Sequence, residues 1–183
     1  CCVSTTGDIY TFGRSDWGQL GHGDFESYNY PKKVSSLNNA DYIEIGGSHV
    51  ICKTFGGDFY CWGNNQYGQL GIGMDISPMQ KFCFPYKCGK WPKNIVEVKS
   101  GDFHILVLTS NREVYSCGDN SYGQLGRNIP GTFSPYLGKV DDLSDIVRME
   151  CGVLHSACID GDKRLYLFGS NVFGQLGYGD TVD

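Results

Sequence analysis

Three histidines are the side chains of this chain best suited to chemistry by their type and spacing. Each stands 11 residues before a tyrosine and follows a glycine by two or three positions: His49, His104 and His155. A neutral imidazole can act as a general base or as a metal ligand. Because the three recur at repeat spacing, they would meet only if all of them faced one central channel. We therefore expect buried imidazoles that hydrogen-bond to the backbone of their own or an adjacent repeat.

Two cysteines offer a second possible chemistry. Cys83 and Cys88 have four residues between them, which is the wide limit of the spacing found for zinc ligands. A zinc site would need a second pair of Cys or His residues, and no such pair is near in the sequence. We predict no metal and no cofactor.

A glycine-rich tetrapeptide, Gly-Gln-Leu-Gly, occurs four times and could be read as a phosphate-binding loop. A loop of that kind should lead into a helix with a Lys-Ser or Lys-Thr pair, and none of the four copies does. We predict structural turns, with the glutamine amides joining one repeat to the next. The residues concerned are Gly18, Gln19, Gly21, Gly68, Gln69, Gly71, Gly123, Gln124, Gly126, Gly174, Gln175 and Gly177.

The elements that must position these residues are strands in a repeated unit of about fifty residues, a period typical of propellers and solenoids. An apolar run follows each histidine, a hairpin turn comes next, and a second strand leads into Tyr-x-aromatic-Gly. Two further short strands are expected in each unit: one near the prolines at 31 and 135, and one before the glycine, as in 42–45, 95–98 and 146–149. No helical period is visible, so the fold is predicted to be all-β.

The full pattern resembles the repeat of the regulator of chromosome condensation (RCC1) family. It reads Gly-x-x-His, an apolar run, Tyr-x-aromatic-Gly-x-Asn-x-aromatic and Gly-Gln-Leu-Gly, and it recurs over essentially the whole chain. Kelch repeats would need a Gly-Gly doublet in every copy, and WD40 units would end in Trp-Asp. The resemblance implies an RCC1-type β-propeller of seven blades, each with four short antiparallel strands.

The chain supplies about 3.6 such blades at its own period of about fifty residues. We expect a single partial propeller domain over 1–183, with repeat copies at 1–46, 47–100, 101–151 and 152–183, the first and last truncated. The remaining blades are expected from the rest of a longer polypeptide. The alternative is a short protein that closes by pairing with a partner or with itself.

Composition narrows the possible partners. The formal net charge is −5 and no basic run of five or more residues occurs, so direct nucleic-acid binding is not expected. No apolar stretch is long enough for a membrane span.

The nine cysteines include Cys2, Cys52 and Cys158 at one repeat position, where the remaining copy has Val107. That exchange indicates a small apolar core position. Reduced thiols favour an intracellular protein, cytoplasmic or nuclear.

The least repetitive segment, 74–93, is the predicted partner-binding loop. It interleaves aromatic and cationic side chains, both common in binding hot spots. The candidates are Lys81, Phe82, Phe84, Tyr86, Lys87 and Trp91. The alternative is that these rings fold back on their own blade. A second variable segment, 127–136, is a weaker candidate for contact.

No catalytic constellation rises above the repeat pattern, so whether the protein is an enzyme stays open. The first functional hypothesis is a protein-interaction scaffold. The second, implied by the family resemblance, is a guanine nucleotide exchange factor whose partner is a small GTPase. The third is the regulatory propeller of a larger multidomain signalling protein.

Overall fold

The computed structural model describes residues 1–73 and 81–182. In that part of the chain every regular element is a β-strand, and no helix has the length and apolar character of a membrane span. Four antiparallel sheets follow one another along the sequence. The chain is thus an all-β segment of a propeller, as predicted.

The two middle sheets have four strands each, and neighbours in the sheet are neighbours in the chain. The second sheet contains β4 (Ala40–Ile45), β5 (His49–Thr54), β6 (Phe59–Asn64) and β7 (Lys81–Lys87). The third contains β8 (Ile95–Ser100), β9 (His104–Thr109), β10 (Val114–Asp119) and β11 (Phe133–Lys139).

The outer two sheets have three described strands each. The first contains β1 (Cys2–Val3), β2 (Ile9–Gly13) and β3 (Tyr28–Lys33), and the fourth contains β12 (Ile146–Cys151), β13 (His155–Asp160) and β14 (Leu165–Gly169). By register, β1 corresponds to the second strand of a complete sheet, and β12 to the first. The predicted four strands per blade are therefore confirmed for the two middle sheets.

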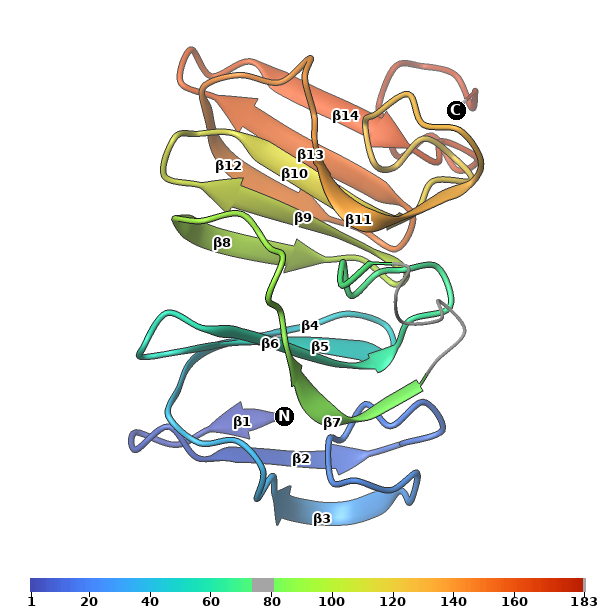
Figure 1. Cartoon of the computed structure of the whole chain (residues 1–183). Helices are drawn as coiled ribbons and strands as arrows, with labels where there is room; N and C mark the ends of the chain where they lie inside the picture. The colour runs from blue at the N-terminus through green and yellow to red at the C-terminus, as the bar shows by residue number, and fades with distance from the viewer. Residues whose placement is uncertain (74–80, 183) are drawn as a thin grey trace.

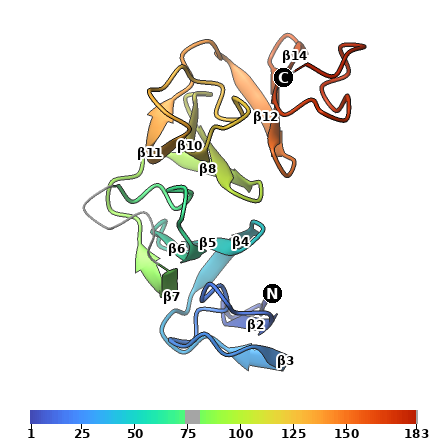
Figure 2. The same cartoon turned by 90° about the vertical axis from the view of Figure 1, so that its right-hand side faces the viewer.

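The sheets stack face to face and fan out into an arc (Figures 1 and 2). The first strands of consecutive sheets contact one another, β4 with β8 and β8 with β12, so they line the inner side of the arc. The last strands, β3, β7 and β11, lie at the outer edge. We call the contact zones between consecutive sheets seams 1, 2 and 3.

Apolar side chains fill the seams, since a sheet must bury its faces against its neighbours. Every residue of β9 is buried, as expected for a central strand covered on both faces. The predicted small core position is occupied by Cys52, Val107 and Cys158, all with at most 1% exposure. Cys2 is exposed instead, because no sheet precedes the first one in this structure.

The segment 74–93 differs from the predicted loop. Residues 81–87 form β7, the outer strand of the second sheet, and 88–94 cross to β8 (Figure 1). Residues 74–80 lie outside the described part of the chain. The strand was missed because this segment departs most from the repeat, so the equivalence of Pro85 with Pro31 was not recognised.

The sequence copies and the sheets are offset. The copies were divided after residues 46, 100 and 151, and each of these positions lies at the turn between the first and second strands of a sheet. One copy therefore holds three strands of one sheet and the first strand of the next. Each of the first three copies spans a seam.

Candidate functional site

The candidate partner-binding residues lie on β7 and on the crossing that follows it, and they divide into two groups. Phe84 and Tyr86 are 56% and 41% exposed, and the side chains of Lys81 and Lys87 are also open to solvent. Phe82 and Trp91 are instead packed against the apolar core of the second sheet. The structure does not bring all six onto one surface.

Lys81 is held over aromatic rings of the first sheet. Its Nζ lies 4.5 Å from the centroid of Trp17 and 5.8 Å from that of Phe25, and it donates a hydrogen bond of 3.0 Å to the Asp16 carbonyl. Cation–π contacts of this kind attract the ammonium to the ring faces. Together with exposed Phe84, these residues form a mixed aromatic and cationic surface across seam 1. We call Trp17, Phe25, Lys81 and Phe84 the seam 1 surface.

Phe82 and Trp91 act from within the sheet. Phe82 packs against the clusters on both sides of the second sheet and meets the Tyr86 ring edge-on at 5.6 Å. The Trp91 indole stacks on Phe59 at 5.5 Å, and its Nε1–H donates to the Leu70 carbonyl at 3.3 Å. These two rings pack against their own blade, and their contact with a partner stays a prediction.

Lys87 belongs to an ion pair that recurs in three sheets. The Lys87 ammonium lies 2.7 Å from the Asp58 carboxylate, where Asp58 begins the third strand and Lys87 ends the fourth. The same pairing joins Lys33 with Asp8 and Lys139 with Glu113. The sequence did not reveal this repetition, since aligning these lysines requires the register of the outer strands.

Phe84 also has equivalents. Tyr30, Phe84 and Tyr136 share one register position on the outer strands and are 56%, 56% and 45% exposed. A side chain at Gly23 would run into the Phe84 ring, and one at Gly73 would meet Tyr136 at 2.6 Å. The aromatic position is therefore a general feature of the rim, while Lys81 and its contact with Trp17 and Phe25 are particular to seam 1.

The second variable segment, 127–136, begins with an internal arginine. The Arg127 guanidinium donates to the hydroxyl and the carbonyl of Ser116, both at 2.9 Å. Half-burial lowers the pKa of Arg127 from its usual value. This side chain stabilises its own blade and is not available to a partner.

The Gly-Gln-Leu-Gly segments are tight turns at the ends of the sheets. Their first glycines have φ between 73° and 77°, a region that favours glycine. Each Gln side-chain oxygen accepts a hydrogen bond from the backbone N–H two residues earlier: Trp17, Tyr67, Tyr122 and Phe173. These amide oxygens thus brace their own turns, contrary to the expectation that they bridge repeats.

The bridging group is the glutamine backbone carbonyl. Trp62 Nε1 donates to the Gln19 carbonyl at 3.0 Å across seam 1, and Ser156 Oγ donates to the Gln124 carbonyl at 2.8 Å across seam 3. At seam 2 the Cys117 thiol lies 3.8 Å from the Gln69 carbonyl. The repeated turn is therefore a joint between blades.

The three histidines each pack on the glycine three positions before them. A Cβ at Gly46, Gly101 or Gly152 would collide with the imidazole of His49, His104 or His155. At Gly46 and Gly101 it would also lie 2.6 Å from a glycine carbonyl of the next sheet. The Gly-x-x-His pattern thus records a steric requirement at the inner end of each seam.

The ring nitrogens of His49 and His104 do not form the expected hydrogen bonds to the backbone. His104 Nε2 lies 3.0 Å from Ser156 Oγ of the next sheet, and within the described residues neither nitrogen of His49 has a partner. Burial lowers the pKa of His49 to about 3 and that of His104 to about 4. These imidazoles stay neutral at physiological pH, and Ser156 is too buried to act as a nucleophile.

The first strands carry polar contacts that also join sheets. The Glu44 carboxylate accepts hydrogen bonds from Tyr42 at 2.7 Å and from the Ser100 N–H at 3.1 Å. The Lys99 ammonium lies 2.9 Å from the Glu150 carboxylate of the fourth sheet. These groups are internally satisfied and fix the inner wall of the arc.

Cys83 and Cys88 do not form a pair. They are five positions apart on extended chain, which corresponds to roughly 16 Å. Cys88 packs into the core, while Cys83 contacts the Gly18 turn. Among the described residues no group of three or more His, Cys, Asp or Glu side chains has the geometry to hold a metal ion.

Known proteins share both the repeat and the fold. The model of the regulator of chromosome condensation (RCC1) repeat matches residues 6–52, 56–108 and 113–159. The E3 ubiquitin-protein ligase HERC2 of Homo sapiens is 33% identical over 97% of this chain, and the serine/threonine-protein kinase Nek9 of Mus musculus is 32% identical over 96%. The chain spans only 4% and 18% of their lengths.

A solved structure shows the same fold. The crystal structure of Prp20p from Saccharomyces cerevisiae, described with its binding to Gsp1p and histones, superposes on 99% of this chain with a TM-score of 0.89. Sequence identity is 22%, and the chain covers 45% of Prp20p.

Proposed function

Since the chain belongs to the RCC1 repeat family, we propose that it acts as a protein-interaction scaffold that contacts its partner through the seam 1 surface. The observation that carries this proposal is the position of Lys81, an exposed ammonium held over Trp17 and Phe25 beside exposed Phe84. Aromatic rings with a cation among them are the usual energetic centre of a binding surface. The buried free thiols favour an intracellular setting for this interaction.

Contact is expected through side chains and not by addition of a strand. The outer strands carry Pro31, Pro85 and Pro135, and proline removes a backbone donor from a sheet edge. A partner that binds here must therefore recognise the rings and the ammonium.

Affinity capture with paired variants tests this proposal. Phe84→Ala and Lys81→Glu should each abolish retention of a specific partner, while the melting temperature changes little because both side chains are exposed. Tyr136→Ala, at the same register on the next blade, is the matched control and should retain the partner. If Tyr136→Ala and Phe84→Ala lose the same partner equally, contact is a general property of the rim and the seam 1 surface is not the site.

Two narrower functions are supported by particular relatives. HERC2 and Nek9 join this repeat to a ubiquitin ligase and a kinase, which favours a regulatory propeller within a larger signalling protein. Prp20p, described with its binding to Gsp1p, favours nucleotide exchange on a small GTPase. Exchange would accelerate release of a fluorescent nucleotide from a purified GTPase, and no acceleration across a panel of GTPases would exclude it.

A further inference from the structure

Three linkers carry the chain from the outer strand of one sheet to the inner strand of the next. They are linker 1 (34–39), linker 2 (88–94) and linker 3 (140–145). The first N–H of each donates to the first residue of the third strand at 2.8–2.9 Å, from Val34, Cys88 and Val140. Each ends on a residue with left-handed backbone: Asn39, Asn94 and Asp145. The linkers are structurally equivalent.

Each linker packs its first residue into its seam and inserts a second apolar side chain three positions later. In linkers 1 and 3 this residue is Leu37 or Leu143, which are 8% and 5% exposed. Linker 2 is one residue longer and inserts Trp91, which remains half-exposed above Phe59. A groove of about 450 Å³ lies beside Trp91. Residues that line it include Lys53, Asp58, Phe59, Trp91, Lys93 and Asn94.

The charge of linker 2 differs from that of the other two. Linker 1 has no charged residue, and linker 3 has Asp141, Asp142 and Asp145. Linker 2 has Lys90 and Lys93 and no acidic residue, although the whole chain has a net charge of −5. Lys53 of β5 adds a further ammonium, 5.9 Å from the Phe59 ring centroid.

The described lining of this groove holds more ammonium groups than carboxylates. Among its described lining residues the one carboxylate is that of Asp58, and it lies 2.7 Å from the Lys87 ammonium. The groove therefore combines an apolar floor, Trp91 on Phe59, with ammonium groups at its margin.

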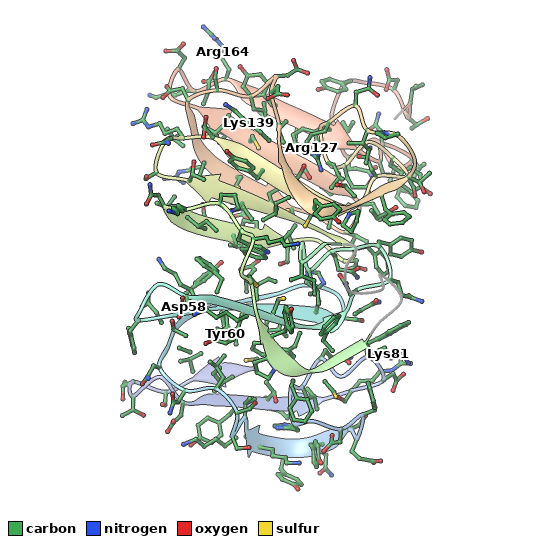
Figure 3. All side chains as sticks on the ribbon, in the orientation of Figure 1. Asp58, Tyr60, Lys81, Arg127, Lys139 and Arg164 are labelled. Carbon is green, nitrogen blue, oxygen red and sulfur yellow. The ribbon has the colours of Figure 1, made fainter. Side chains whose placement is uncertain are left out.

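We propose that the linker 2 groove binds an acidic segment of a protein partner, with carboxylates at Lys53 and Lys93 and an apolar side chain on Trp91. No arginine lines the groove, so the planar, bidentate recognition typical of phosphate sites is missing from the described residues. Asp58 lies at the opposite end of the second sheet from Lys81, so this groove and the seam 1 surface are separate (Figure 3). The proposal rests on the scaffold function only in taking a protein as the occupant.

Fluorescence anisotropy on the 183-residue chain tests the groove directly. The probe is a fluorescein-labelled peptide of six glutamates around a central leucine, and its glutamine counterpart is the uncharged control. We expect saturable binding of the glutamate peptide that weakens about tenfold between 50 and 300 mM salt, because exposed charges are screened. Equal binding of the glutamine peptide, or no binding of the glutamate peptide at 50 mM salt, would overturn the proposal.

Matched lysine variants locate the site. Lys53→Gln with Lys93→Gln should weaken the glutamate peptide about tenfold, as expected for the loss of two ion pairs. Lys163→Gln removes an exposed lysine from the fourth sheet and should leave binding unchanged. Equal effects of the double variant and Lys163→Gln would mean that the peptide binds in response to the net charge of the protein and not at a particular site.

Two further arms separate this site from its alternatives. A phosphoserine peptide that binds through Lys53 and Lys93 more than tenfold tighter than the glutamate peptide would make phosphate the ligand and contradict the proposal. Phe84→Ala should bind the glutamate peptide normally. Loss of the captured partner in Phe84→Ala with normal peptide binding supports both sites, whereas loss of peptide binding in the lysine double variant alone bears only on the groove.

Discussion

Seams 2 and 3 have the same backbone arrangement, but the side chains of their linkers differ. In both, a linker packs two apolar side chains into the seam, a left-handed residue ends that linker, and a histidine packs on a glycine at the inner end. Linker 2 is basic and inserts Trp91, while linker 3 is acidic and inserts Leu143. The fold thus fixes where contacts are made, and it leaves the charge of each linker free to differ.

The inner ends of the two seams differ in hydrogen bonding. Ser156 follows His155 and reaches both His104 Nε2 and the Gln124 carbonyl. The equivalent residue at seam 2 is Ile105, so His49 Nε2 has no partner among the described residues, while Nδ1 has none in either His49 or His104. Seam 2 replaces a polar bridge with apolar packing.

The largest effect should come from a change that both seams resist equally. Gly101→Ala and Gly46→Ala each place a methyl group against an imidazole and a carbonyl of the next sheet, so each should lower the free energy of unfolding by about 3 kcal/mol. Urea denaturation measures this cost. Gly89→Ala is the control, since a Cβ there meets no atom within 4 Å. If only one of the two variants lost stability, the common geometry of the two seams would not contribute equally to the free energy of unfolding.

Acidification should destabilise both seams. His49 and His104 have folded pKa values of about 3 and about 4, below the unfolded value near 6.5. The unfolded chain therefore takes up protons first, and stability falls as the pH drops from about 6.5 towards these folded values. By pH 5 each histidine should cost about 2 kcal/mol. Urea titrations at pH 7 and pH 5 measure the loss, and it should shrink in His49→Gln and in His104→Gln. An unchanged pH dependence in both variants would contradict this assignment.

The polar bridge of seam 3 should have a smaller, local value. Ser156→Ala leaves His104 Nε2 and the Gln124 carbonyl without their partner, which should cost about 1.5 kcal/mol. Thermal unfolding measures the change. Ser134→Ala, whose hydroxyl bonds to a carbonyl at the exposed rim, should have little effect. Equal losses in the two variants would mean that the bridge does not stabilise seam 3.

The smallest effect should follow from making linker 2 resemble linker 3. Trp91→Leu removes the hydrogen bond to the Leu70 carbonyl and the stacking on Phe59, and should cost about 1 kcal/mol. Calorimetry measures the stability, and the glutamate peptide should lose affinity because the apolar floor is gone. Unchanged affinity for the glutamate peptide would mean that Trp91 does not contribute to binding in the groove.

The sequence was sufficient for those elements that carry the repeat motif. The strands around Tyr60, Tyr115 and Tyr166 were predicted, because alternation and turn residues identify them locally. β7 was not, since the segment 74–93 departs from the repeat in length and the place of β7 is set by pairing with β6. The equivalence of Trp91 with Leu37 and Leu143 was missed, because linker 2 has one residue more than the other two linkers.

The role of the candidate residues in partner binding stays a prediction. Lys81 and Phe84 are exposed, Lys87 is paired with Asp58, and Phe82 is partly buried against the core. Phe25 and Lys53 were not predicted as site residues, because each contacts residues that are distant in the sequence. Phe25 lies near Lys81, and Lys53 lines a groove with residues of linker 2. Contacts across a seam cannot be read from either repeat alone.

The offset between sequence copies and sheets also affects how the chain can come apart. Because each of the first three copies ends with the first strand of the following sheet, excising one of them would remove strands from two sheets at once. The stability of stacked repeats is the sum of the stability of each repeat and the interaction energy between neighbouring repeats. Here one sequence copy already includes strands from both sides of an interface between sheets. Amide protons of the first strands should therefore exchange together with those of both adjoining copies, so that opening spreads along the arc instead of releasing one blade.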